Sequence, residues 1–166
     1  MRFARVTTPI GDLVVAGDGA VHGVLFDPHR GGDPVGSDWK RDDDAFADAA
    51  AQLTEWFAGA RRDFDFELAP VGTPFQRRVW DALRAIPYGE TRTYAEIAAS
   101  LRTAPRAVGA ANGANPFAVV VPCHRLVGTA GLTGYAGGLE RKRWLLDFEG
   151  QTSSSRPTPA SRSTST

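Results

Sequence analysis

The hydrophobic period of the sequence changes at a break formed by residues 70–72, Pro-Val-Gly. Before the break, apolar runs of strand length alternate with glycine and proline turn signals, whereas after it apolar residues recur at helical spacing. Apolar residues that alternate as in a strand cannot all lie on one face of a helix, and apolar residues at helical spacing cannot all lie on one face of a strand. The change therefore predicts an α+β fold, with a sheet-bearing domain at residues 1–70 and a helical domain at residues 71–150.

The N-terminal domain is expected to contain an antiparallel meander and one helix. Turn signals such as Pro-Ile-Gly-Asp at residues 9–12 separate three apolar runs. Helical spacing predicts a helix at residues 42–58, whose acidic first residues suit the positive end of the helix dipole. Phe64, Phe66 and Leu68 alternate with acids and predict a further strand. The expected strands of the meander are residues 2–8, 13–16 and 21–26, followed by a loop at residues 27–41.

Three helix-start signals organise the C-terminal domain. Thr73 can cap a first helix that has Pro74 at its first position, and residues 93–96, Thr-Tyr-Ala-Glu, have the form of a capping box. Pro105 suits the first position of a third helix. Two short helices joined by a tight turn resemble a helix-turn-helix, with Arg106 exposed at the start of the second.

The end of the sequence predicts a closing helix and a tail. Helical spacing at residues 139–148 places Trp144, Leu145 and Phe148 on an inward face. Residues 151–166 are rich in Ser, Thr and Pro and have no periodicity, which is typical of a disordered segment without a catalytic role.

The composition of the 166 residues predicts a cytoplasmic protein. The sequence shows no apolar run of about 18 residues and no basic leader before an apolar segment, so neither a membrane span nor a secretory signal is expected. One cysteine fits a reducing compartment, and three histidines without zinc-ligand spacing favour no metal. Residues 1–70 carry seven Lys and Arg against thirteen Asp and Glu, whereas residues 71–150 carry ten against six. A basic field in the second domain suits a polyanionic partner.

The single cysteine, Cys123, follows an apolar strand-like segment and directly precedes His124. A buried lone cysteine is most often an inert small hydrophobe. A nucleophilic cysteine needs a base, and His124 can serve only if the chain bends at Pro122-Cys123, because neighbours in a strand point to opposite faces. The group that orients the base must come from elsewhere, and Asp147 and Glu149 are candidates. The surrounding basic segment is expected to favour the thiolate.

Five motifs follow one another in the C-terminal domain. They are residues 86–91 (Ile-Pro-Tyr-Gly-Glu-Thr), 106–109 (Arg-Ala-Val-Gly), 112–116 (Asn-Gly-Ala-Asn-Pro), 122–125 (Pro-Cys-His-Arg) and 132–138 (Leu-Thr-Gly-Tyr-Ala-Gly-Gly). Together they resemble the O6-alkylguanine-DNA alkyltransferase family, over residues 73–149. For the fold, the resemblance implies a ribonuclease-H-like N-terminal domain and a winged-helix-like C-terminal domain with a helix-turn-helix.

The resemblance implies a direct-reversal DNA repair protein that is consumed by its own reaction. Cys123 would accept the alkyl group of O6-alkylguanine, and also of O4-alkylthymine, in one irreversible SN2 step. His124 would act as the base through a water molecule, with Glu149 orienting it. Tyr94 would donate toward the guanine ring, and Asn115 would brace the turn between the DNA-reading helix and the cysteine.

The resemblance also implies that the target nucleotide is flipped out of a DNA duplex into a pocket. Arg106 would enter the base stack through the minor groove, with small residues behind it keeping the helix face thin, and Arg102 is a further candidate for DNA contact. The other residues expected to bind DNA are Ala107, Gly109, Ala111 and Gly113. Those expected to line the substrate pocket are Pro122, Val127, Tyr135, Ala136 and Gly137.

The implied partner is double-stranded DNA that carries O6-alkylguanine, bound by a monomer, with cooperativity on DNA left open. The resemblance implies no cofactor, metal or membrane. Two loops are shorter than is usual in the family: residues 128–132 lack one residue, and the turn before Arg106 is short, with Pro105 where the family tends to have alanine. The tolerance of bulky alkyl groups and the angle at which Arg106 is presented therefore stay open.

Three other functions compete with alkyl transfer. An alkyltransferase-like protein binds the lesion without transferring anything, but such proteins generally lack the nucleophile, so Cys123 argues against this reading. A hydrolase with a Cys-His-Glu triad needs an oxyanion hole that no motif specifies. A purely structural DNA-binding winged helix leaves the pair of Cys123 and His124 unexplained.

Overall fold

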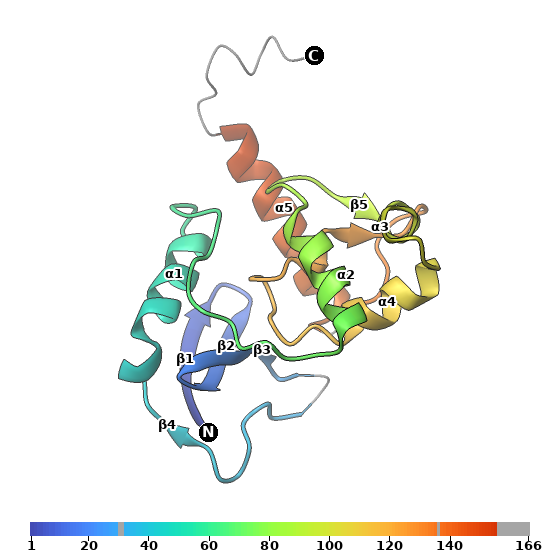
Figure 1. The fold of residues 1–166 in the computed structure, drawn as a ribbon. Coiled ribbons are helices and arrows are strands. Elements are labelled where there is room, and N and C mark those ends of the chain that lie inside the picture. The colour runs from blue at the N-terminus through green and yellow to red at the C-terminus, as the bar shows by residue number, and fades with distance from the viewer. Residues whose placement is uncertain (30–31, 136, 156–166) are drawn as a thin grey trace.

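The computed structural model describes residues 1–29, 32–135 and 137–155 (Figure 1). A sheet covered by one helix makes up the N-terminal part of the chain, and a group of helices makes up the rest. Elements of the two kinds are segregated along the chain, so the predicted α+β class is confirmed.

The sheet has the strand order β3-β2-β1-β4. β1 (Arg2–Thr8) pairs antiparallel with β2 (Gly11–Asp18), which pairs antiparallel with β3 (Ala20–Asp27), so the predicted meander is confirmed. The short β4 (Lys40–Arg41) lies parallel to β1. The prediction of a loop throughout residues 27–41 was therefore wrong, because this segment returns to satisfy the open edge of β1.

The central strand β2 is buried on both faces. Leu13 and Val15 point into the main core, whereas Val14 and Ala16 pack with Phe3 on the opposite face. A strand covered on both sides reads as a continuous apolar run, which is why this strand stood out in the sequence.

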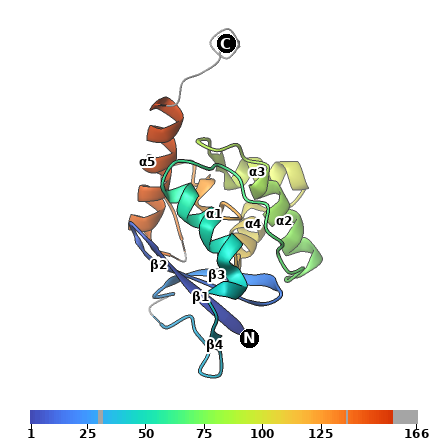
Figure 2. The ribbon, with the colours of Figure 1, turned by 90° about the vertical axis from the view of Figure 1, so that its left-hand side faces the viewer.

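Helix α1 (Ala47–Phe57) lies across one face of the sheet (Figure 2). One turn of 3-10 helix, η1 (Asp44–Phe46), precedes it, so the predicted helix begins with a tighter turn than expected. Leu53 and Trp56 on its inner face are fully buried, and their packing on the sheet stabilises the N-terminal part.

The strand predicted over residues 64–68 does not form. Phe64, Phe66 and Leu68 are half-buried between exposed acids, so the period of two is present. Leu68 makes one isolated bridge, with Val21 of β3, and no ladder follows it. The prediction was wrong because alternation reports which side chains are buried, whereas a strand also needs a partner along its length.

Threonine caps begin two helices of the C-terminal part. The side chains of Thr73 and Thr93 each accept a hydrogen bond of 3.1 Å from the backbone N–H three residues further on. Helix α2 (Pro74–Arg84) follows the first cap and α3 (Tyr94–Leu101) follows the second. Both predicted caps are confirmed, including the reciprocal bond of the capping box at each.

A tight turn joins α3 to α4 (Pro105–Gly113), as predicted for the helix-turn-helix. Arg102 ends α3 in the left-handed conformation, with φ of 57°. Pro105 occupies the first turn of α4, where its missing N–H is not needed. Two short strands, β5 (Arg92–Thr93) and β6 (Leu126–Val127), pair in parallel beside these helices.

The closing helix α5 (Leu139–Ser155) is longer than predicted. It continues through residues 151–155, so the prediction that disorder begins at residue 151 was wrong. Thr152 and the Tyr88 hydroxyl share a hydrogen bond of 2.5 Å that ties this extra turn to the protein. Residues 156–166, the rest of the expected tail, lie outside the described residues. As predicted, α5 turns these side chains toward the core: Trp144, Leu145 and Phe148.

Strand β3 connects the sheet directly to the helical part. Val24 donates to the Pro116 carbonyl at 2.8 Å and accepts from the Ala118 N–H at 2.8 Å. The main hydrophobic core therefore runs without interruption from the sheet into the helices. Within residues 1–29, 32–135 and 137–155, no helix is both long and apolar enough to span a bilayer.

Candidate active site

A turn at residues 115–122 leads from α4 to the cysteine. Asn115 donates from Nδ2 to the Val121 carbonyl at 2.9 Å, and its Oδ1 accepts from the Phe117 N–H at 3.0 Å. Within this turn Val119 has φ of 69°, a conformation that is rare for a β-branched residue. The hydrogen bonds of the buried Asn115 side chain thus stabilise a turn in which the backbone of Val119 adopts an unfavourable conformation.

The chain bends at the cysteine, as the sequence analysis required. Cys123–Arg125 form one turn of 3-10 helix, η2, which places successive side chains about 120° apart instead of on opposite faces. Cys123 is 8% exposed and His124 is completely buried. The bend allows both side chains to contribute to one site.

Glu149 of α5 is the centre of a buried hydrogen-bond network. His124 Nε2 donates to Glu149 Oε2 at 2.8 Å, so the predicted pair is brought together. Arg125 donates to the same carboxylate through Nε at 2.9 Å and Nη2 at 2.8 Å, and its Nη1 donates to the Ile86 carbonyl at 2.8 Å. The Gly89 N–H adds a bond of 3.2 Å. Asp147, the other candidate, is exposed at the surface.

The network sets the protonation of its members. Burial alone would raise the pKa of Glu149, but the hydrogen bonds and charges of His124 and Arg125 outweigh it and lower that pKa to about 2. Burial lowers the pKa of His124 below its usual 6.5, against the pull of Glu149. Because an ionised carboxylate only accepts, Nε2 of the neutral imidazole carries the proton and Nδ1 keeps its lone pair. Nδ1 makes no hydrogen bond to any described residue.

Burial also controls the thiol. It raises the pKa of Cys123 above its usual 9.0, although Asn115, Lys142 and Tyr135 favour the thiolate. The expectation that the basic segment favours a thiolate was therefore wrong for the resting protein, because desolvation exceeds the attraction of the nearby cation. The thiol is protonated at neutral pH and needs a base to become a nucleophile.

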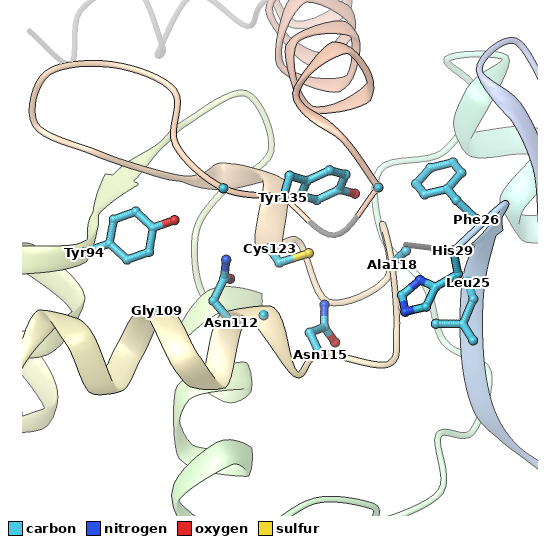
Figure 3. A pocket seen from close by; sticks show the side chains of 13 residues that line it. Leu25, Phe26, His29, Tyr94, Gly109, Asn112, Asn115, Ala118, Cys123 and Tyr135 are labelled. Carbon is cyan, nitrogen blue, oxygen red and sulfur yellow. The ribbon is translucent and has the colours of Figure 1, made fainter. Parts of the chain in front are cut away.

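Cys123 lines a pocket between the two halves of the molecule (Figure 3). Tyr94, at the start of α3, lies on one side of the cysteine, and the buried Tyr135 hydroxyl lies beside the thiol. Burial raises the pKa of Tyr135 well above its usual 10.0, so this hydroxyl keeps its proton. Further walls of the pocket come from α4 (Gly109, Asn112, Gly113), the turn (Asn115, Ala118) and β3 with the residues after it (Leu25, Phe26, His29).

The predicted pocket residues divide into two groups. Tyr135 and Gly137 line the pocket, and Ala136 lies outside the described residues. Pro122 and Val127 do not line it, so their assignment was wrong. Pro122 borders a separate hollow on the other side of the turn, and Val127 is held in β6 by pairing with β5.

A buried lysine holds the loop that closes the pocket. Lys142 has no exposed surface, and its Nζ donates to the carbonyls of Thr133 at 2.6 Å and Gly134 at 3.3 Å. At Gly137 a Cβ would come within 2.7 Å of the Tyr135 ring and 3.0 Å of the Phe26 ring. The loop can therefore approach the sheet this closely only with glycine at that position.

The expected DNA-binding residues of α4 are mostly, but not all, at the surface. Arg106 is exposed, as is Arg102 before the helix. Ala111 is only 3% exposed and its carbonyl accepts from Trp80 Nε1 at 2.8 Å, so its place on the binding face was predicted wrongly. Its position in the helical period turns it toward α2 and the core. The remaining three are partly exposed: Ala107, Gly109 and Gly113.

Two charged residues of the site, Arg125 and Lys142, were not predicted from the sequence. Arg125 and Lys142 are both buried, and charged residues are almost never buried without a partner. For Arg125 a signal was present in the sequence. It follows His124 directly and lies within an otherwise mostly apolar segment, so it was a candidate for burial. The pocket wall from β3 gave no local signal, because only the folded chain brings it to the cysteine.

The described side chains supply the pocket with a nucleophile and hydroxyl donors, and the residue after the nucleophile supplies a base that is buried and does not line the pocket. Cys123 has a thiol, His124 has an available Nδ1 lone pair, and Tyr94 has a hydroxyl. In the described parts of the chain, no group of three or more His, Cys, Asp or Glu is arranged to hold a metal ion. Fold and site together define a protein that combines a buried cysteine nucleophile with a helix-turn-helix.

Comparisons with known proteins agree with this class. Residues 1–70 match the family described as 6-O-methylguanine DNA methyltransferase, ribonuclease-like domain, and residues 74–151 match 6-O-methylguanine DNA methyltransferase, DNA binding domain. The methylated-DNA–protein-cysteine methyltransferase of Mycobacterium tuberculosis H37Rv is 49% identical over 152 residues, which cover 90% of this chain and 92% of the relative. That of Methanosarcina acetivorans is 47% identical over 154 residues, 90% of this chain and 99% of the relative.

A solved structure is similar along nearly the whole chain. The crystal structure of Mycobacterium tuberculosis OGT in complex with DNA superposes with a TM-score of 0.84 at 46% identity, covering 92% of this chain and 94% of that one. With both domain models and full-length relatives matching, the chain belongs to the 6-O-methylguanine DNA methyltransferase family.

Proposed function

We propose that this protein repairs DNA by transferring the alkyl group of O6-alkylguanine to Cys123 in one irreversible step. The observation that carries the proposal is the position of Cys123, which lines a pocket beside α4 and has the pair of His124 and Glu149 next to it. The relatives are named methylated-DNA–protein-cysteine methyltransferases, and these names describe the same reaction.

In the proposed reaction, the Cys123 thiol gives its proton through a water molecule to Nδ1 of His124. The orphaned Nδ1 and the protonated resting thiol support this route. The sulfur bonds to the alkyl carbon as the bond from that carbon to O6 breaks, and the released electron pair goes to the guanine. Tyr94 donates its hydroxyl proton to the guanine, which leaves as a neutral base, and the proton taken up by His124 returns through water to the Tyr94 oxygen. Cys123 is not regenerated, because breaking the carbon–sulfur bond of the product would require the cysteine thiolate, a poor leaving group, to depart from the alkyl carbon.

The same proposal assigns DNA binding to α4. An alkylated base that is stacked in a duplex cannot reach a pocket, so it must be flipped out. Arg106, exposed in the first turn of α4, is proposed to fill the space that the base leaves. O4-alkylthymine carries its alkyl group on an equivalent exocyclic oxygen and is proposed as a second substrate. Monomeric state and cytoplasmic location stay predictions.

Intact-protein mass spectrometry tests the proposal. One equivalent of a duplex that contains O6-methylguanine should add the mass of a single methyl group to the protein. The unmodified duplex and the Cys123→Ala variant are the controls, and neither should give an adduct. Binding of the methylated duplex without any adduct would point to a lesion-binding protein, and turnover beyond one equivalent would point to a true catalyst.

A further inference from the structure

The Tyr94 hydroxyl has a hydrogen-bond partner in the loop that closes the pocket. The hydroxyl of Thr133 donates to the Tyr94 oxygen at 3.3 Å. Among the described residues, Thr133 is the only one that forms a hydrogen bond with this hydroxyl. Thr133 lies between β6 and α5, in the same loop that brings Tyr135 and Gly137 to the pocket. The loop therefore meets the start of α3 at two hydroxyl groups.

The ring of Tyr94 is held in place by the helix beside it. A Cβ at Gly109 of α4 would lie 3.6 Å from this ring, so the ring packs against the backbone of the helix. Figure 3 shows the hydroxyl on the side of the ring that faces Cys123. The Tyr94 oxygen is thus fixed at a point where it can reach a ligand in the pocket while it accepts a hydrogen bond from Thr133.

Thr133 is exposed, but contacts fix both its backbone and its side chain. The buried Lys142 donates from Nζ to the Thr133 carbonyl at 2.6 Å. Gly128 and Gly131 close the preceding turn with backbone hydrogen bonds of 2.9 and 3.2 Å. A Cβ at Gly128 would come within 3.1 Å of the Thr133 side-chain methyl group, so this side chain packs against the turn. Little conformational entropy is therefore left to lose when the Thr133 hydroxyl is used.

The proposed transfer places negative charge on the Tyr94 oxygen. Tyr94 gives its proton to the guanine, and until the proton taken up by His124 returns, the Tyr94 oxygen carries the charge. A hydrogen bond to a charged oxygen is shorter and stronger than one to a neutral oxygen. The distance of 3.3 Å is long for two hydroxyls, so the bond can shorten as the charge develops. An interaction that is stronger in the transition state than in the resting protein lowers the barrier to transfer.

We propose that Thr133 is a positioning residue for the transfer, whose hydroxyl holds the Tyr94 oxygen and stabilises it while Tyr94 gives up its proton. The inference rests on the proposed alkyl transfer to Cys123 and on the role of Tyr94 in it. Because Thr133 occupies one lone pair of the Tyr94 oxygen, the Tyr94 O–H points elsewhere and is available to the guanine. Thr133 does not line the pocket, so it acts only through Tyr94.

An isosteric substitution tests this assignment. Thr133→Val replaces the hydroxyl by a methyl group and keeps the branched shape of the side chain. Single-turnover transfer from a duplex that contains O6-methylguanine is measured over a range of DNA concentrations. The maximal rate should fall about tenfold, the lower end of the factor for one hydrogen bond to a charged group. The DNA concentration that gives half of the maximal rate should not change. Thr133→Ser keeps the hydroxyl and should recover most of the rate.

A double-mutant cycle separates a role through Tyr94 from a general structural role. Tyr94→Phe should lower the maximal rate, and adding Thr133→Val to it should cause no further loss. Thr129→Val is the matched control, because Thr129 is an exposed threonine of the same loop with no hydrogen bond to Tyr94, so its rate should equal that of the wild type. Additive losses in the double variant, or an unchanged rate in Thr133→Val, would overturn the role of Thr133 and leave alkyl transfer intact.

The reference reactions distinguish this inference from the proposed function. The methyl groups transferred at completion measure the active fraction of every preparation. A normal rate in Tyr94→Phe would leave alkyl transfer in place but overturn the roles of both Tyr94 and Thr133. Absence of methyl transfer in the wild type would overturn the proposed function and, with it, the role of Thr133.

Discussion

The two working parts of this protein are built in opposite ways. His124, Arg125 and Glu149 are at most 6% exposed and are joined by hydrogen bonds, whereas Arg106 at the start of α4 is exposed. A buried polar group is costly unless every partner is present, whereas an exposed arginine is solvated until a ligand arrives. The proposed alkyl transfer therefore depends on a buried network that is destabilised when any one of its side chains is removed. The proposed DNA binding depends on an exposed surface, where a side chain can be replaced without loss of stability. Substitutions should separate the two.

The largest effect is expected from breaking the buried ion pair. Arg125→Met leaves the Glu149 carboxylate buried without its main partner, which should lower the free energy of unfolding by about 3–5 kcal/mol. The matched control is Arg92→Met. Arg92 and Glu90 form a surface pair of 3.2 Å with side chains 36% and 53% exposed, and its loss should cost about 1 kcal/mol or less. Urea unfolding measures both, and equal losses would contradict the contrast between buried and exposed charges.

Acid should weaken the buried network in two pH windows. The pKa of Glu149 is about 2 in the folded protein against a usual 4.5, so its contribution, about 3 kcal/mol, is present above pH 4.5 and is lost as the pH falls to 2. The pKa of His124 is lowered, so the unfolded chain takes up protons first and stability also declines as the pH falls below 6.5. Urea unfolding from pH 7 downward measures both. Glu149→Gln should flatten the lower window, and parallel curves for the two proteins would refute this assignment.

The third prediction concerns the rate of transfer. Glu149→Gln keeps an oxygen that accepts from His124 but removes the charge that stabilises the protonated base, so single-turnover transfer should slow by about 100-fold. DNA affinity, measured by fluorescence anisotropy at pH 7 on protein shown to be folded, should not change. A loss of affinity as large as the loss of rate would mean that the network and the binding face are not separate.

The smallest of these effects is expected at the exposed face. Arg106→Ala should reduce both DNA affinity and transfer rate by about tenfold and leave thermal stability unchanged. Arg41→Ala is the control, because Arg41 is an equally exposed arginine on β4, away from α4 (Figure 1). Binding by anisotropy and transfer by single-turnover kinetics check the prediction. An unchanged transfer rate in Arg106→Ala would remove its proposed role in flipping.

Local signals in the sequence predicted most of the fold. The capping boxes at Thr73 and Thr93 and the proline at position 105 each act within one helical turn, so the residues that decide the structure are adjacent in the sequence. The bend at Cys123 was likewise expected, because the chemistry requires it. The pairing of His124 with Glu149 was expected from the family resemblance.

Properties that depend on distant contacts were predicted poorly. The strand at residues 64–68 lacked a partner along its length, and Ala111 turned out to face α2. The raised pKa of Cys123 reflects burial by the whole fold, which a count of nearby charges does not report. The wall of the pocket that carries His29 comes from β3 and the residues directly after it, far from Cys123 in the sequence, so no motif near Cys123 contains it.

Stoichiometry in excess substrate tests the central claim most directly. The protein is mixed with an excess of duplex that contains O6-methylguanine, the guanine restored is measured over time, and peptide mass spectrometry locates the methyl group. The account predicts a plateau of one guanine restored per protein molecule, with every methyl group on Cys123. Continued turnover past that plateau, a methyl group on another residue, or no restored guanine would contradict the assignment of Cys123 as an acceptor that is used once.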